Sequence, residues 1–139
     1  MLAMLANIIY MIIQFMLFGV TGWCMEILWT GLHSLFKKDY KLIATTSIWM
    51  FFIYGMAVFL KPLCDVLLGM SFPLVLRGGI YMLCIFAAEF TAGFTMKRLN
   101  ACPWDYSDSR FNVLGLIRLD YAPVWFAAGL VMEALHARL

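Results

Sequence analysis

The sequence contains few charged residues. They make up 13% of its 139 residues, about half the share found in soluble domains. Hydrophobic residues make up 65%, well above the roughly one half that is usual in soluble domains. So few charges cannot cover a surface that faces water on every side. We therefore expect an integral protein of the cell membrane, with the lipid bilayer as its main partner.

Other absences exclude whole classes of function. The net charge is only +2 and no run of Lys or Arg is longer than two, so nothing predicts binding to nucleic acid. The four cysteines form no Cys-x-x-Cys pair, so neither a metal site nor a disulfide framework is expected. No phosphate-binding Gly-x-x-x-x-Gly-Lys-Ser/Thr loop is present. We predict no cofactor, and no signal peptide, because the first ten residues lack a basic start.

Four apolar segments are long enough to cross a bilayer, which takes about 20 residues. They cover residues 5–32, 43–60, 74–96 and 119–135, and Lys61 and Pro62 are expected to end the second. The sequence therefore predicts an all-α, polytopic membrane protein, a single domain over residues 1–139 with four transmembrane helices. The stretch 111–119 before the last helix is too apolar to float in water, so we expect this loop to be partly membrane-embedded.

The distribution of basic residues predicts the orientation of the chain. Loops 33–42 and 97–118 fall on the same side of the membrane and hold seven of the ten cations. By the positive-inside rule these two loops are predicted to be cytoplasmic. The seven are Lys37, Lys38, Lys41, Lys97, Arg98, Arg110 and Arg118, and the other side holds Lys61, Arg77 and Arg138.

Three of the predicted helices contain a glutamate, at Glu26, Glu89 and Glu133. A carboxylate at the centre of a membrane helix costs about 3 kcal/mol, so each needs a partner or a proton. Glu26 and Glu89 each lie about two turns from the predicted cytoplasmic end, which predicts that they share one level. Glu133 lies near the opposite end, where Arg77 can reach it. We predict a structural ion pair between Glu133 and Arg77.

The largest break in the apolar pattern is the segment 102–108, Cys-Pro-Trp-Asp-Tyr-Ser-Asp. Its carboxylates suit a cation or an amine, and its aromatic rings suit a quaternary ammonium group. The nearby arginines would neutralise the aspartates or hold a phosphate, which indicates a zwitterionic ligand. The alternative is a structural plug, in which the aspartates bond to nearby backbone and the rings sit at the membrane interface. The predicted ligand-binding residues are Glu26, Glu89, Trp104, Asp105, Tyr106, Asp108, Arg110 and Arg118.

A faint repeat relates the two halves of the chain, in which a glutamate, a tryptophan and a glycine recur in the same order. The residues are Glu26, Trp49 and Gly55, and then Glu89, Trp125 and Gly129. With four spans this order would be a parallel duplication, of a kind that some transporters use.

Several motifs together resemble a known family. They are the segments 22–26, 46–55, 89–93 and 100–108, with Phe111, Asn112, Gly115 and Trp125. The set resembles the family described as "Putative ABC-transporter type IV", or CmpB-like, and is similar to the group that includes vertebrate transmembrane protein 229. The resemblance covers nearly the whole chain and implies a small multi-pass membrane protein of transporter type.

The favoured interpretation is a permease-like subunit that binds a small cationic or zwitterionic ligand on the cytoplasmic side. Four spans are few for a permease, so we expect a homo-oligomer, and a separate ATPase subunit is a possible partner. One alternative is a membrane-embedded enzyme that acts on a lipid headgroup, with Arg110 or Arg118 on the phosphate. We favour it less and assign no catalytic residue, because no histidine lies beside the aspartates. Another alternative is a structural or assembly protein without a ligand.

Overall fold

The computed structural model describes all 139 residues and contains five α-helices. Three helical segments are long and apolar enough to cross a membrane: Leu2–Phe36, Ile48–Gly69 and Leu74–Arg98. The mostly helical membrane architecture predicted from the sequence is thus present. The predicted fourth span falls on α5, Ala122–His136, which has 15 residues, fewer than the roughly 20 that a full crossing takes. A fourth crossing therefore stays a prediction.

The chain forms two compact units. Unit 1 consists of residues 1–62 together with Leu139, and unit 2 consists of residues 63–138. Each unit has its own packed helices. The single domain expected from the sequence stays a prediction.

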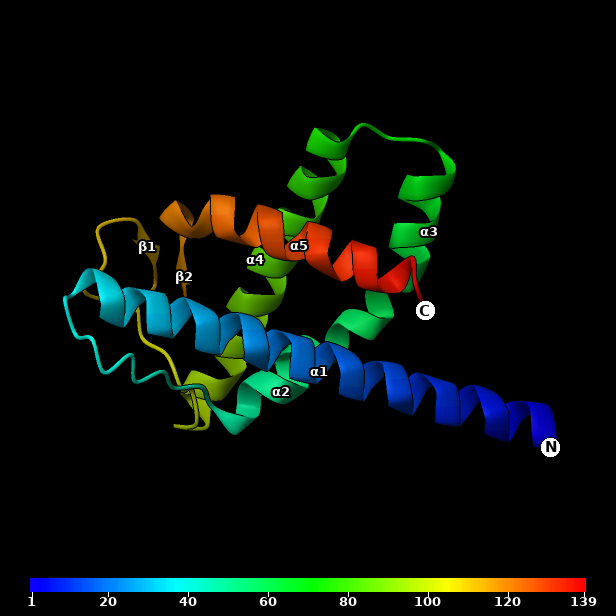
Figure 1. Ribbon diagram of the computed structural model, residues 1–139, viewed down its shortest axis with the longest axis horizontal. Coiled ribbons are helices and arrows are strands. Elements are labelled where there is room, and N and C mark those ends of the chain that lie inside the picture. Colours follow the sequence, from blue (N-terminus) through cyan, green and yellow to red (C-terminus); the bar gives the residue numbers. More distant parts are fainter. The chain divides into compact units, whose positions relative to one another are not determined.

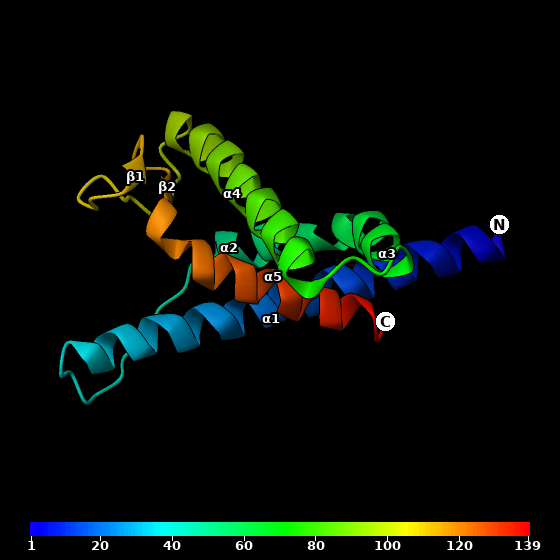
Figure 2. The same ribbon diagram turned by 90° about the horizontal axis from the view of Figure 1, so that it is seen from above.

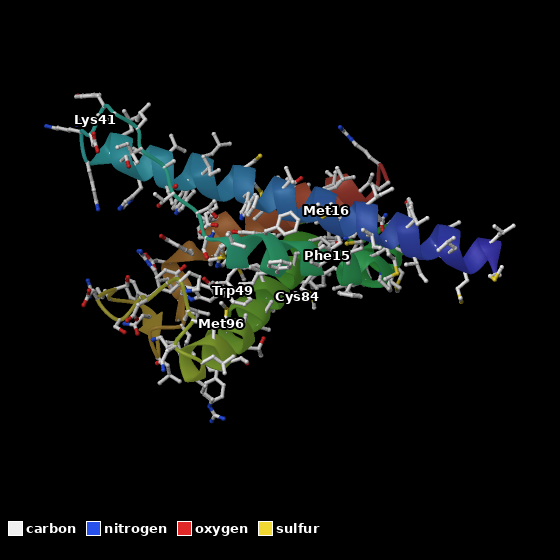
Figure 3. All side chains as sticks on the ribbon, turned by 90° about the horizontal axis from the view of Figure 1, so that it is seen from below. Phe15, Met16, Lys41, Trp49, Cys84 and Met96 are labelled. Atoms are coloured by element: carbon white, nitrogen blue, oxygen red, sulfur yellow. The ribbon has the colours of Figure 1, made fainter.

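Unit 1 is built on the long helix α1, Leu2–Phe36, with the short helix α2, Ile48–Gly55, packed beside it (Figure 1). Figure 3 shows Phe15 where α1 meets α2, and its ring lies 6.0 Å from that of Phe51. The two helices approach closely because glycines on each face aromatic rings on the other. A Cβ atom added to Gly22 would overlap the side chain of Tyr54.

The helix that begins with α2 continues beyond its predicted end. It passes through a 3₁₀ turn, η1 (Met56–Leu60), into α3, Lys61–Gly69. Pro62 does not stop it, because Pro62 lies in the first turn of α3, where a missing N–H removes no bond within that helix. The helical segment therefore ends at Gly69 rather than at Lys61 and Pro62.

Residues 42–47, between α1 and α2, form neither helix nor strand. Alternate carbonyls of this segment lie within hydrogen-bond distance of side chains spaced one or two turns apart on α1. The pairs are Ser34 Oγ with Ile43 O (3.0 Å), Thr30 Oγ with Thr45 O (3.1 Å), and Trp23 Nε1 with Ser47 O (2.9 Å). Irregular backbone beside an apolar helix needs such partners, because lipid supplies none.

In unit 2 the helix α4, Leu74–Arg98, packs against α5 (Figure 2). The close approach again depends on glycines that face rings. A Cβ on Gly78 would overlap the ring of Phe126, and a Cβ on Gly129 would overlap Tyr81. Tyr81 is 1% exposed, so this contact lies at the centre of the packed helices.

The apolar stretch before α5 folds into a small hairpin, the one departure from an all-α fold. Its strands are β1, Asn112–Val113, and β2, Ile117–Arg118, and they pair antiparallel. The 3₁₀ turn η2, Leu119–Tyr121, then leads into α5. Gly115 has a φ of +66°, and a Cβ there would lie 2.8 Å from the carboxylate of Asp105. The turn of the hairpin therefore requires a glycine at this position.

Gly22→Ala should destabilise unit 1 by about 1–3 kcal/mol, because the added methyl group overlaps Tyr54 in a packed interface. Thermal unfolding in detergent measures the effect. Gly31→Ala is the matched control on the same helix, since its Cβ would meet only Ala44 at an ordinary 3.6 Å. Equal melting temperatures for the two variants would contradict the packing described here.

Candidate functional site

The predicted pair of Glu133 and Arg77 lies at the α4–α5 contact. Arg77 Nε donates to Glu133 Oε2 at 2.8 Å, and Arg77 Nη2 donates to Oε1 at 3.2 Å. The hydroxyl of Tyr81 donates to Oε2 at 2.6 Å. The Glu133 side chain is 8% exposed. A buried carboxylate with a two-point guanidinium partner is a structural ion pair, which fastens α5 to α4.

Glu89 has different partners. Its half-buried carboxylate accepts a hydrogen bond from the hydroxyl of Tyr106 at 3.0 Å and one from the indole of Trp125 at 3.2 Å. Tyr121 lies between these two rings, 5.9 Å from Tyr106 and 6.1 Å from Trp125, edge-to-face with both. The carboxylate of a candidate membrane helix is thus held by uncharged donors from two other segments. We call Glu89, Tyr106, Tyr121 and Trp125 the Glu89 cluster.

Arg118 lies beside this cluster. Its guanidinium stacks over the ring of Tyr121 at 4.3 Å. It also forms an ion pair with Asp120, with Nη2 2.5 Å from Oδ2. The structure therefore places Arg118 near the aromatic rings of the Glu89 cluster, where its own carboxylate partner holds it in position.

Trp104 holds the hairpin against α4. Its indole donates to the carbonyl of Leu116 at 2.9 Å. A Cβ on Gly93 would lie 3.1 Å from the Trp104 ring, so glycine allows the ring to pack on the helix. Both contacts hold the loop in place, and a ligand role for Trp104 stays a prediction.

The two predicted aspartates and Arg110 lie at the surface of the same loop. Asp105 accepts hydrogen bonds from the hydroxyl and the N–H of Ser107, at 2.6 and 3.1 Å, and from Lys97 at 3.3 Å. The Ser107 bonds, and then the Lys97 ammonium, hold the pKa of Asp105 below its usual value. Asp108 and Arg110 are exposed, and Arg110 stacks over Phe111 at 5.3 Å. A ligand role for Asp105, Asp108 and Arg110 stays a prediction.

Glu26 belongs to unit 1, where the hydroxyl of Thr46 donates to its Oε2 at 2.5 Å. Thr46 lies in the segment 42–47, whose carbonyls accept hydrogen bonds from side chains of α1. Glu26 thus also pairs with an uncharged donor. A binding site shared by Glu26 and Glu89 stays a prediction.

The reasoning from sequence missed two members of the Glu89 cluster as ligand-binding candidates, Tyr121 and Trp125. They lie in a segment that reads as an apolar helix, where aromatic residues usually serve packing. Their spacing of four residues was the available signal, because positions i and i+4 share a helix face.

Three helices long and apolar enough to cross a membrane define a multi-pass membrane protein. The chain matches the family described as "Putative ABC-transporter type IV" over residues 13–139 and belongs to it. This match confirms the resemblance to that family inferred from the sequence motifs, whereas the similarity to the transmembrane protein 229 group stays a prediction. No solved structure matches the chain.

Arg77→Met should destabilise the protein by about 3 kcal/mol or more, because it leaves the buried Glu133 carboxylate without its cation. Adding Glu133→Gln should recover much of that loss, since a buried amide needs no counter-charge. Thermal unfolding of the two single variants and the double variant forms a complete cycle. Additive losses in the double variant would contradict a direct ion pair.

Asp105→Asn should lower the melting temperature at neutral pH but not in acid. Because folding lowers the pKa of Asp105, the ionised form stabilises the folded loop. That stabilisation is present above the unfolded pKa of about 3.9 and is lost as the pH falls through the lower folded value. Melting curves of both proteins, recorded from pH 7 downward, should converge below about pH 4. A difference that does not depend on pH would contradict this assignment.

Proposed function

We propose that the protein is a transporter-type membrane subunit that binds a small organic cation or zwitterion at the Glu89 cluster. One observation carries the proposal: the carboxylate of Glu89 lies on a candidate membrane helix, and both of its hydrogen-bond partners are uncharged. Membership of a family described as transporter-like supports it.

The contrast with Glu133 supports a ligand role for Glu89. An ionised carboxylate at membrane depth is stable only with a cation or an equivalent partner. Glu133 has Arg77 at 2.8 Å, so its charge is neutralised within the chain. The charge of Glu89 is left for a proton or a bound cation to neutralise.

The aromatic residues indicate the chemical class of that cation. Tyr106, Tyr121 and Trp125 gather beside the carboxylate, and aromatic faces attract quaternary and other organic ammonium groups. Arg118, stacked on Tyr121, can hold the anionic end of a zwitterion if that group replaces Asp120 as its partner. The proposed ligand is therefore an amine or ammonium compound, with or without an acidic group.

The orientation and the assembly are parts of the same proposal. Loops 33–42 and 97–118 carry seven of the ten cations and lie on one side of the membrane whether the chain crosses it three or four times. The positive-inside rule makes that side cytoplasmic. So few helices favour a homo-oligomer, and the absence of an ATP-binding loop favours a separate ATPase subunit. Glu26, with its uncharged partner Thr46, is kept as a second cation-binding candidate.

A structural role without any ligand is the second candidate. Trp104 and Asp105 use their polar atoms within the loop, as they would in a plug that only supports the helices. In that case the hydrogen bonds that Tyr106 and Trp125 donate to Glu89 also only support the packing of the helices. The two functions differ in their response to added cations.

Tetramethylammonium or choline should raise the melting temperature of the detergent-purified protein, whereas sodium at the same ionic strength should not. A ligand at ten times its Kd stabilises by about 1.4 kcal/mol. Glu89→Gln should abolish the rise, because the amide keeps the shape of the carboxylate but not its charge. Asp39→Asn is the control and should keep the rise, since Asp39 is exposed and is not among the predicted ligand-binding residues.

An equal rise in Glu89→Gln would show that the cation binds elsewhere. No rise in the unmodified protein with either ammonium compound would favour the structural role.

A further inference from the structure

A second candidate site lies on the surface of unit 2, at the end of α4. It is a groove of about 320 Å³ lined by Phe94, Lys97, Arg98, Leu114 and Leu116. Glu89 is not among its lining residues, so the groove is distinct from the site of the proposed function.

The groove joins an apolar wall to two cations. Phe94 is 43% exposed and Leu114 is 71% exposed, while Lys97 and Arg98 form the last turn of a candidate membrane helix. The end of such a helix lies at the level of the lipid headgroups, where basic residues meet phosphate. Apolar side chains beside them are then at the depth of the upper acyl chain.

Leu114 is held in an unusual conformation. Its φ is +53°, in the left-handed region that residues other than Gly, Asn and Asp rarely adopt. The hairpin turn thus presents a leucine outward at an energetic cost, and packing within the unit does not account for it. Contact with an acyl chain gives this exposed side chain an apolar environment.

Arg98 is placed to bind a phosphate. Its guanidinium stacks on the Phe94 ring at 4.4 Å, and a stacked guanidinium still has N–H groups around its edge that match phosphate oxygens. Lys97 Nζ lies 3.3 Å from Asp105 and 3.4 Å from the carbonyl of Leu114. These two contacts keep the second cation at the groove, and Asp105 offsets part of its charge.

We infer that this groove binds an anionic phospholipid, with the phosphate on Arg98 and Lys97 and an acyl chain on Phe94 and Leu114. Charge complementarity selects the occupant. Two cations with one nearby carboxylate leave a net positive groove, which favours a net-negative headgroup over a zwitterionic one.

Native mass spectrometry of the full chain in detergent tests this inference. Phosphatidylglycerol should bind in preference to phosphatidylcholine with the same acyl chains. Arg98→Gln should weaken phosphatidylglycerol binding about fivefold, the effect of one basic residue beside an anionic lipid. Arg138→Gln removes an exposed cation outside the groove and should leave the binding unchanged.

Leu114→Asn tests the apolar part of the groove without breaking the turn, because asparagine tolerates a positive φ. It should weaken the binding of both lipids. Glycerol phosphate, which has the headgroup chemistry but no acyl chain, should not displace phosphatidylglycerol.

Equal binding of the two lipids by the unmodified protein would overturn the inference. So would full displacement by glycerol phosphate, which would make the groove a site for free phosphate. Unchanged phosphatidylglycerol binding in Arg98→Gln would also overturn it. Glu89→Gln should retain lipid binding, so failure here is distinguishable from failure of the proposed function.

Discussion

A carboxylate on an apolar helix has no water to solvate it, so another part of the chain or a ligand must supply its partners. In this protein Glu26, Glu89 and Glu133 each accept hydrogen bonds from a different element, and those bonds fasten the elements to one another. The donors are Thr46 for Glu26, Tyr106 and Trp125 for Glu89, and Arg77 and Tyr81 for Glu133. Only the donors to Glu133 include a charged group. We therefore assign a structural role to Glu133 and propose a ligand-binding role for Glu89.

The same constraint shapes the segments that are not helical. The carbonyls of residues 42–47 lie against polar side chains of α1, and the hairpin before α5 is held by the Trp104 indole. Glycines then let the helices come close enough for these bonds to form, as Gly22 does in unit 1 and Gly129 in unit 2. Each unit thus combines glycine–aromatic packing with a carboxylate that has an uncharged donor.

The sequence predicted the features that follow from the order of apolar segments and charged residues along the chain. Apolar runs located the three candidate membrane helices, and the position of Arg77 one helix away from Glu133 anticipated their contact. Pro62 was misleading, because a proline in the first turn of a helix removes no bond within it. The aspartates near Trp104 fitted either a ligand or bonds within the loop. In the structure Asp105 bonds to its own loop, and its ligand role stays a prediction. Tyr121 was overlooked because an aromatic residue in an apolar segment resembles core.

Calorimetric titration of tetramethylammonium into the detergent-purified protein, with Glu89→Gln titrated in parallel, tests the central claim most directly. The account predicts saturable binding of about one cation per chain to the unmodified protein and no measurable binding to the variant. The same binding to both proteins, or none to either, would contradict the claim that the Glu89 carboxylate is held ready for a cation.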